Sequence, residues 1–286
     1  MRALVVSGVA ALALSAGCAR RGGPPREPPL EELETALEPA AVARALLRAG
    51  GGHYHAVLTM ELNAPGSNGE GTVKDSVTTT TDVWVDKQGQ YRLVESNDLD
   101  GGREIVRYGR DLAVAMRYGR MIRRPLQDAE AARYLEEAVG GPAAAWEVAR
   151  RFADVSRKND VLSSGKATTY NIEKAHEPQA VRADFESASP LQKWRETINA
   201  ESVAGTLSLD QASLVPMKGG LEAHFSLNRD GVPITGLVKV DLATRELGAV
   251  KAIEAPQQAE DVPARQRTIL EERALLGRAA NEGGRR

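Results

Sequence analysis

The stretch HYHAVLTMEL, residues 53–62, decides the fold class of this chain. Apolar side chains occupy every even position from Tyr54 to Leu62, whereas most of the odd positions from His53 to Glu61 are polar. An alternation with a period of two is typical of a strand that buries one face and leaves the other in solvent. The stretch therefore predicts a β-strand that packs one of its two faces against the core.

Further strands are expected on both sides of this one. The segment 72–86 contains a run of threonines followed by Val83, Trp84 and Val85, and β-branched residues favour a pleated surface. Near the other end of the chain, Asn228–Gly231 reads NRDG and is typical of a hairpin turn. The expected strands are residues 53–62, 72–86, 91–95, 103–108, 111–116, 120–123, 168–174, 201–209, 221–227 and 232–242, with 250–254 as a last one.

Helical periodicity flanks and interrupts the strands. Residues 30–49 place Leu30, Leu33 and Leu37 on one stripe, and Pro39 predicts either one kinked helix or two short ones. Helices are also expected over 128–139, from Pro142 to Phe152, and over 263–276. The predicted fold is mainly β (α+β): a curved antiparallel sheet, or half-barrel, with an N-terminal helix and two plug helices.

The first residues describe an export signal. Arg2 precedes an apolar run over 3–16 that is too short to span a bilayer, and small residues lead to Cys18. This pattern resembles the bacterial lipoprotein signal, which implies cleavage before Cys18 and acylation of that residue. The alternative is an ordinary secretory signal with an incidental cysteine. Ala19 after the cysteine resembles the default outer-membrane class.

These observations predict four regions and a location. The expected regions are a signal peptide (1–17), a Pro/Gly/Arg tether (18–29), the half-barrel domain (30–258), and a C-terminal helix with a charged tail (259–286). The tether is rich in proline and glycine, which favour an extended spacer. The resemblance implies a protein of the cell envelope, anchored by lipid in the outer membrane and facing the periplasm.

Composition excludes several classes of function. The 286 residues contain 37 Lys and Arg against 39 Asp and Glu, so no basic footprint for nucleic acid is expected. Cys18 is the one cysteine, and its acylation would leave no thiol for disulfides or for a metal site. No second apolar run approaches the length that spans a membrane.

Catalytic patterns are missing from the sequence. No Gly-x-Ser-x-Gly elbow occurs, and the glycine-rich stretch 66–71 lacks the lysine of a phosphate-binding loop. His53 and His55 lie two apart on a predicted strand, so both point to one face and could hold a metal. A solvent-facing pair is the preferred interpretation. We therefore predict no catalytic residue, no metal and no cofactor, and a protein that is not an enzyme.

The concave side of such a sheet must be filled by side chains or by a ligand. The alternation of Trp84 with Val83 and Val85 leaves open which of them points inward. A core beneath the plug helices is an equally weighted alternative to a ligand cavity. The predicted lining residues are Trp84, Leu93, Val106, Val114, Met116, Ile122, Phe225 and Ile234.

At this point the order of elements resembles the periplasmic lipoprotein-carrier and outer-membrane acceptor superfamily (LolA/LolB-like). The resemblance would cover residues 50–255, and in that superfamily a half-barrel holds acyl chains of lipoproteins or lipids in a hydrophobic cavity. A lipid-anchored member resembles the acceptor. The local matches are VWV (83–85), YRL (91–93), IVRYGRDL (105–112) and GTLSLD (205–210). This chain departs from the pattern because only 4% of its residues are aromatic and its loop 64–71 is small and polar.

Two functions follow as hypotheses. The first is a lipid-anchored envelope protein that binds a hydrophobic ligand, an acyl chain or a lipoprotein, in a half-barrel cavity. The alternative is a non-catalytic structural or interaction lipoprotein that binds an envelope protein partner with its sheet surface. In both, the chain meets the membrane through acylated Cys18.

Overall fold

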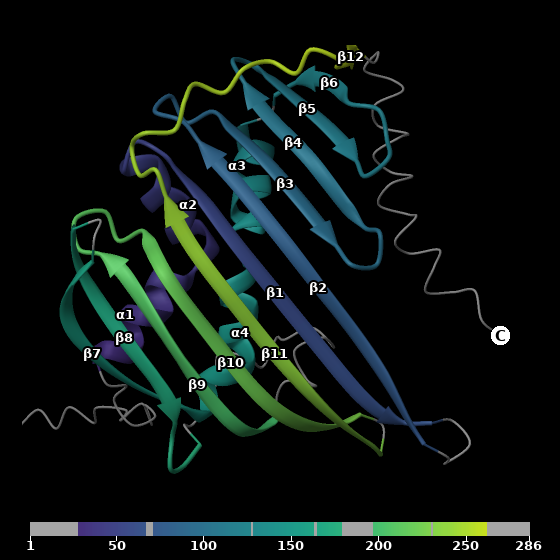
Figure 1. The fold of residues 1–286 in the computed structure, drawn as a ribbon, viewed down its shortest axis with the longest axis vertical. Helices are drawn as coiled ribbons and strands as arrows, with labels where there is room; N and C mark the ends of the chain where they lie inside the picture. The colour runs from purple at the N-terminus through teal and green to yellow at the C-terminus, as the bar shows by residue number, and fades with distance from the viewer. Residues whose placement is uncertain are drawn as a thin grey trace, which may run out of the picture.

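The computed structural model describes six ranges of the chain: residues 28–66, 71–126, 128–162, 165–178, 197–229 and 231–261. These ranges contain one twelve-stranded sheet and four α-helices. The sheet is curved and does not close on itself (Figure 1). The predicted fold class is thereby confirmed. Cys18, most of the tether and the helix expected over 263–276 lie outside the described residues.

Two meanders make up the sheet. β1 to β6 follow one another on one side, β11 to β7 on the other, and the pairing of β1 with β11 joins them. All neighbouring strands are antiparallel except β12, which is parallel to β6. The strands are β1 (Gly52–Pro65), β2 (Thr72–Val85), β3 (Tyr91–Asn97), β4 (Gly102–Tyr108), β5 (Asp111–Met116), β6 (Ile122–Pro125), β7 (Ala153–Leu162), β8 (Gly165–Lys174), β9 (Asn199–Asp210), β10 (Pro216–Arg229), β11 (Val232–Arg245) and β12 (Glu260–Asp261).

β1 has the alternation that its sequence predicts. Tyr54 and Ala56 are buried, while His53 and His55, which alternate with them, are half-buried on the opposite face. We call the face of Tyr54 the inner face of the sheet and the face of His53 the outer face. Across the inner face, Tyr54 lies opposite Val83 of β2 and Thr244 of β11. The strand therefore supplies the centre of the core from the middle of the sheet.

The N-terminal helical segment divides as Pro39 predicts. α1 (Pro28–Leu37) ends two residues before Pro39, and α2 (Pro39–Arg48) begins at that proline. The apolar stripe of each helix is buried, with Leu33 and Leu46 completely inaccessible to solvent. Burial of one such leucine contributes about 1.5–3 kcal/mol. The two helices are therefore held by packing against the inner face.

The two plug helices follow β6. α3 (Asp128–Ala138) contacts α2 and β3, whereas α4 (Gly141–Ala149) contacts β1, β9, β10 and β11. A single 3-10 turn, Arg150–Phe152, connects α4 to β7. Figure 1 shows the helices behind the sheet, on one side of it. The inner face thus has its own cover of helices.

The turn from α2 into β1 requires glycine. Gly51 has φ +91°, and a Cβ atom built there would lie 2.0 Å from the carbonyl oxygen of Val85. Only a residue without a side chain allows this approach of the chain to the end of β2. The Gly50–Gly52 run therefore both ends the helix and lets β1 enter the sheet.

One strand prediction was wrong and one long strand was missed. Residues 250–254 form no strand; they belong to a strap, residues 246–261, that crosses the ends of the strands from β11 to β6 (Figure 1). The strap is held by hydrogen bonds from Ile253 N to Asp86 Oδ2 and from Glu260 N to Met121 O, both 2.9 Å. β7 was not predicted at all, because an edge strand that reads SRKND over 156–160 has no apolar alternation.

Two buried tyrosines provide a test of the core. Tyr54 and Tyr91 are both completely buried, and burial raises the pKa of each hydroxyl well above its ordinary value. Tyr91 Oη donates a hydrogen bond to Ala131 O at 2.9 Å, whereas Tyr54 Oη has no partner among the described residues. The two positions are therefore a matched pair.

We expect Tyr91→Phe to lower the free energy of unfolding by about 0.5–1.5 kcal/mol, because a buried hydrogen bond is lost. Tyr54→Phe should leave it unchanged or raise it by about 1–3 kcal/mol, because an unsatisfied buried hydroxyl is removed. Urea unfolding of the two variants measures both. Equal losses in the two variants would contradict the packing described here.

Candidate functional site

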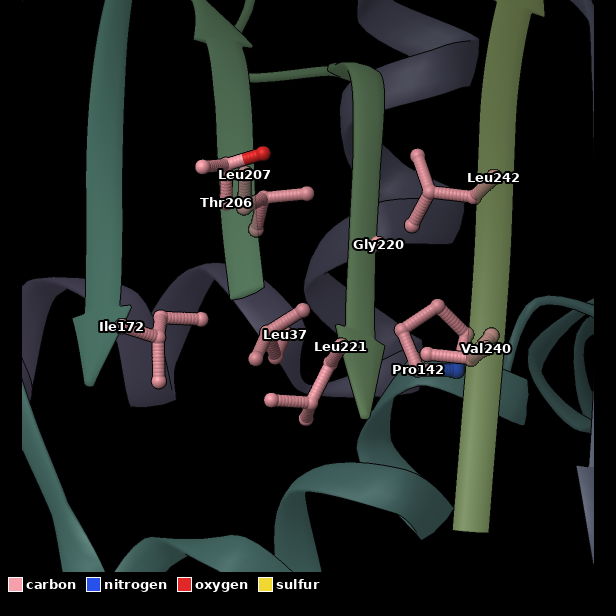
Figure 2. A pocket seen from close by; sticks show the side chains of 9 residues that line it. All are labelled: Leu37, Pro142, Ile172, Thr206, Leu207, Gly220, Leu221, Val240 and Leu242. Atoms are coloured by element: carbon pink, nitrogen blue, oxygen red, sulfur yellow. The ribbon is translucent and has the colours of Figure 1, made fainter. Parts of the chain in front are cut away.

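The helices and the inner face of the sheet pack together in one cluster of buried apolar residues. A void between them has a volume of about 20 Å³, room for about one water molecule. Side chains from α1, from the start of α4 and from β8 to β11 surround it (Figure 2). The residues around it are Leu37, Pro142, Ile172, Thr206, Leu207, Gly220, Leu221, Val240 and Leu242. Pockets that hold small molecules have about 300–1,000 Å³, so this void is not one of them as it stands.

None of the eight predicted lining residues borders this void. Leu93 and Phe225 are core residues with 0% and 2% exposure. Val114 and Ile234 are partly buried against the core. Ile122, which lies opposite Val114, is half-buried, and Met116 is half-exposed at the end of β5.

The remaining two predicted lining residues, Trp84 and Val106, are on the outer face, so their assignment was wrong. Val83 and Val85 are completely buried, and strand alternation turns Trp84 between them to the other side. Val106 follows, because Trp84 lies opposite Arg92 and Arg92 opposite Val106. Both faces of β2 carry apolar residues here, which is why the sequence left the orientation of Trp84 open.

The outer face of β1 and β2 brings three polar side chains together. Asp82 Oδ1 accepts hydrogen bonds from His53 Nε2 at 2.8 Å and from His55 Nδ1 at 2.9 Å. His53 and Asp82 are about three-quarters or more buried, and His55 is more exposed. The two histidines are on the outer face of the sheet, as a solvent-facing pair would be, but they are tied to a shared carboxylate and only partly exposed.

Trp84 extends this group across the next strands. Its ring stacks on the His53 ring, with 4.6 Å between the centroids and 13° between the planes. The Arg92 guanidinium lies 5.9 Å from the centroid of the Trp84 ring, and Arg92 Nε donates to Glu104 Oε1 at 2.8 Å. We call His53, His55, Asp82, Trp84, Arg92 and Glu104 the outer-face cluster; it spans β1 to β4.

The outer-face cluster has the chemistry of a binding surface. An aromatic ring held between an imidazole and a guanidinium can present its edge to a partner, and Trp and Arg are enriched where interfaces hold most of their energy. Within the described ranges, no group of three or more His, Cys, Asp or Glu has the arrangement needed to hold a metal ion. The geometry therefore supports recognition, with each polar group already oriented by a neighbour.

A second concavity lies at the ends of the strands. It has a volume of about 400 Å³ and is open to solvent, and Leu214 beside it has φ +63° and is half-exposed. Asp210 Oδ2 is already used within the turn, because it accepts from Ser213 N and Ser213 Oγ, each at 2.7 Å. Its lining residues are Arg48, Ala49, Asp210, Ala212, Ser213, Leu214 and Leu247. Few polar groups converge on this hollow, so the outer-face cluster is the stronger candidate.

Sequence reasoning missed the outer-face cluster as a unit, although a signal for it existed. The hairpin of β1 and β2 pairs Pro65 with Thr72, and the same register brings His53 opposite Trp84 and His55 opposite Asp82. A hairpin centred on the glycine-rich loop would have predicted these pairs. The contact with Arg92 additionally required the register of β3.

Comparison with known proteins finds little. No family model matches the chain, and no curated protein matches it. Among solved structures, a DUF1329 family protein from Desulfovibrio piger is 10% identical, with a TM-score of 0.20, over 76% of this chain and 92% of its own. A β-barrel-like protein of the DUF1849 domain from Brucella abortus is 13% identical, with a TM-score of 0.17, over 68% and 98%. The MucA/MucB complex of Pseudomonas aeruginosa contributes a chain 13% identical, with a TM-score of 0.14, over 77% and 99%. Likenesses at these TM-scores support no conclusion about this chain.

Removal of the shared carboxylate tests the outer-face cluster. We expect Asp82→Ala to lower the free energy of unfolding by about 1 kcal/mol, because two imidazoles lose their acceptor in a half-buried place. Glu222→Ala is the matched control, since Glu222 accepts from His224 at 3.2 Å on an exposed part of the sheet. The control should cost less than about 0.5 kcal/mol in urea unfolding. A control loss as large as that of Asp82→Ala would show that burial adds nothing to the cluster.

Proposed function

We propose that this chain is a non-catalytic, lipid-anchored protein of the bacterial cell envelope that binds a protein partner through the outer-face cluster. The anchor is acylated Cys18, and the binding element is the outer surface of β1 to β4. The outer membrane, facing the periplasm, is the proposed location.

The N-terminal sequence supports the anchor. α1 begins at Pro28, ten residues after Cys18, and an extended chain of that length spans at most ~35 Å. In the described part of the chain, no helix has the length and apolar character to cross a bilayer. An acylated Cys18 would therefore keep the sheet within a short distance of the membrane surface.

The position of Trp84 is the observation that carries the proposal of a protein partner. It is a large aromatic side chain in the middle of the sheet, turned away from the helices and the core. His53 stacks on it and Arg92 lies over it, so the ring is held in place before any partner arrives. Ordered aromatic residues lose little conformational entropy on binding, and they are typical anchors of protein interfaces.

The packing of the inner face also favours surface recognition. A void of about 20 Å³ beneath the helices leaves no room for an acyl chain without movement of α1 or α4. Binding in that place would have to displace buried leucines such as Leu37 and Leu221, each of which contributes to stability.

One observation favours the hydrophobic-ligand function as a second candidate. On the inner face of β1, Leu58, Met60 and Leu62 are only partly buried, and Ile234 of β11 is in the same state. An acyl chain of a lipid or lipoprotein could lie along this end of the sheet. The two candidates use opposite faces, so experiments separate them.

Replacement of Cys18 tests the anchor. We expect Cys18→Ser to move the protein from the membrane to the soluble fraction and to abolish incorporation of labelled palmitate, because the acylated thiol is lost. Membrane fractionation and metabolic labelling measure this. Retention of label or of membrane attachment in Cys18→Ser would refute lipidation at this residue.

Truncation of the aromatic ring tests the partner. With a photoreactive residue in place of Glu104, we expect a discrete crosslinked adduct in cells, and Trp84→Ala should reduce its yield at least about tenfold. Val73→Ala is the control, because Val73 is 59% exposed near the far end of the same strand and on the inner face. It should leave the yield unchanged.

The same preparations address the second candidate. Lipid that co-purifies with the Cys18→Ser chain and disappears when Met60→Trp fills this end of the inner face, together with no adduct at position 104, would reject the partner and favour the hydrophobic ligand.

A further inference from the structure

The two edges of the sheet differ in whether a further strand pairs with them. At one edge β12 pairs with β6, and the side chains reinforce this pairing because Arg123 Nε donates to Asp261 Oδ1 at 2.6 Å. At the other edge, β7 has no further strand beside it within the described residues. An edge strand offers a row of backbone donors and acceptors to any chain that can approach it.

The pairing of β7 with β8 shows which backbone groups face away. Phe152 O accepts from Ala175 N at 2.7 Å, in the same register that pairs Ala153 with Lys174. In an antiparallel pair the bonded positions alternate, so even-numbered residues of β7 bond to β8. Val155, Arg157, Asn159 and Val161 therefore direct their N–H and C=O groups outward.

One of these outward backbone groups is hydrogen-bonded to a side chain of its own strand. Val161 N donates to Oδ1 of Asp160, the neighbouring residue, at 3.0 Å. The Val161 side chain is 77% exposed, and Asn159 is exposed as well. A carboxylate that caps the next backbone amide is what an edge without a strand neighbour allows, and another strand could replace it.

We propose that β7 pairs with β7 of a second copy of this chain, antiparallel, with Asn159 opposite Asn159 across a two-fold axis. In this register the outward groups of Arg157 meet those of Val161 on the other copy. Lys158 of each copy then lies opposite Asp160 of the other, so two pairs of opposite charges flank the axis. Opposite charges on facing residues stabilise a strand pair, and like charges destabilise it.

Neighbouring registers are unfavourable for the same reason. A slide of two residues one way sets Lys158 opposite Lys158, and two residues the other way sets Asp160 opposite Asp160. A slide of four residues faces Asp154 with Asp160. The charges on β7 thus discourage unspecific edge pairing and disfavour these three registers.

One rival register also pairs opposite charges. With Ser156 on the axis, Asp154 lies opposite Lys158, but the ladder then has to include Ala153. Ala153 has no exposed surface and already takes part in an interaction at the junction with the 3-10 turn. The Asn159-centred register avoids that junction, which is why we favour it.

A single introduced cysteine distinguishes the registers. Asn159→Cys, in the full-length chain in its own membrane, should form a disulfide-linked dimer on mild oxidation. Facing residues of a bonded antiparallel pair have Cα atoms about 5.5 Å apart, within the range that a disulfide bridges. Ser156→Cys is the matched control, exposed on the same strand, and should stay monomeric. Both are made with native Cys18 and with Cys18→Ser, so that no dimer arises through residue 18.

Exchange of the charges at positions 158 and 160 is an independent test of the register. In the Asn159→Cys background, Lys158→Asp should reduce the dimer about fivefold to tenfold, because each facing pair becomes two carboxylates. The double change Lys158→Asp with Asp160→Lys should restore it. Circular dichroism of each variant verifies that the sheet is intact.

Three results would overturn the proposal. The first is a dimer from Ser156→Cys in place of Asn159→Cys, and the second is crosslinking of Asn159→Cys to a different protein. The third is a yield of disulfide-linked dimer that neither charge change alters. Since these positions lie away from the outer-face cluster, the result is independent of whether that cluster binds a partner.

Discussion

The pairing of β1 with β11 is the interaction on which the rest of the structure depends. It joins residues near opposite ends of the chain, such as His53 and Arg245, and it turns two local meanders into one sheet. Contacts so distant in sequence cost loop entropy before they stabilise anything, so the meanders and hairpins around them must be stable enough to bring the ends together. α4 packs over this junction, because it contacts β1, β10 and β11.

The strap is a second connection between parts of the sheet that are distant in sequence. Asp86 is a carboxylate with 1% exposure, and its two oxygens accept from Gln88 N, Gln90 N and Ile253 N, each at 2.9 Å. A buried charge is tolerated only when such donors surround it. Since one donor belongs to the strap, this carboxylate connects the turn after β2 to the segment that leads to β12. The same segment that crosses the strand ends thereby protects one edge of the sheet.

Because helix side chains pack against the inner face, the outer surface of the sheet is the stronger candidate for binding. A curved sheet can hold a ligand only if its own helices leave room, and here Leu33, Leu46 and other helix residues occupy that room. Three surfaces are then candidates for recognition: the outer face, where Trp84 and its neighbours are held in place, the edge at β7, which has no further strand beside it among the described residues, and the partly buried end of the inner face at Leu58, Met60 and Leu62. The proposed lipid anchor would present these surfaces close to a membrane.

The sequence by itself determined the strands with an alternating pattern, the break at Pro39, the two plug helices and so the fold class, because periodicity and turn chemistry are local. It predicted neither β7, whose charged residues show no alternation, nor the irregular path of 250–254. Only the tertiary structure decided which face each strand buries. On β2, apolar residues stand at three successive positions, and a shift of one residue reverses the two faces. The face of the sheet that carries Trp84 is therefore fixed only by the packing of the core. It likewise decided that Asp82 lies between His53 and His55, because the register of two strands brings together residues that the sequence separates by almost thirty positions.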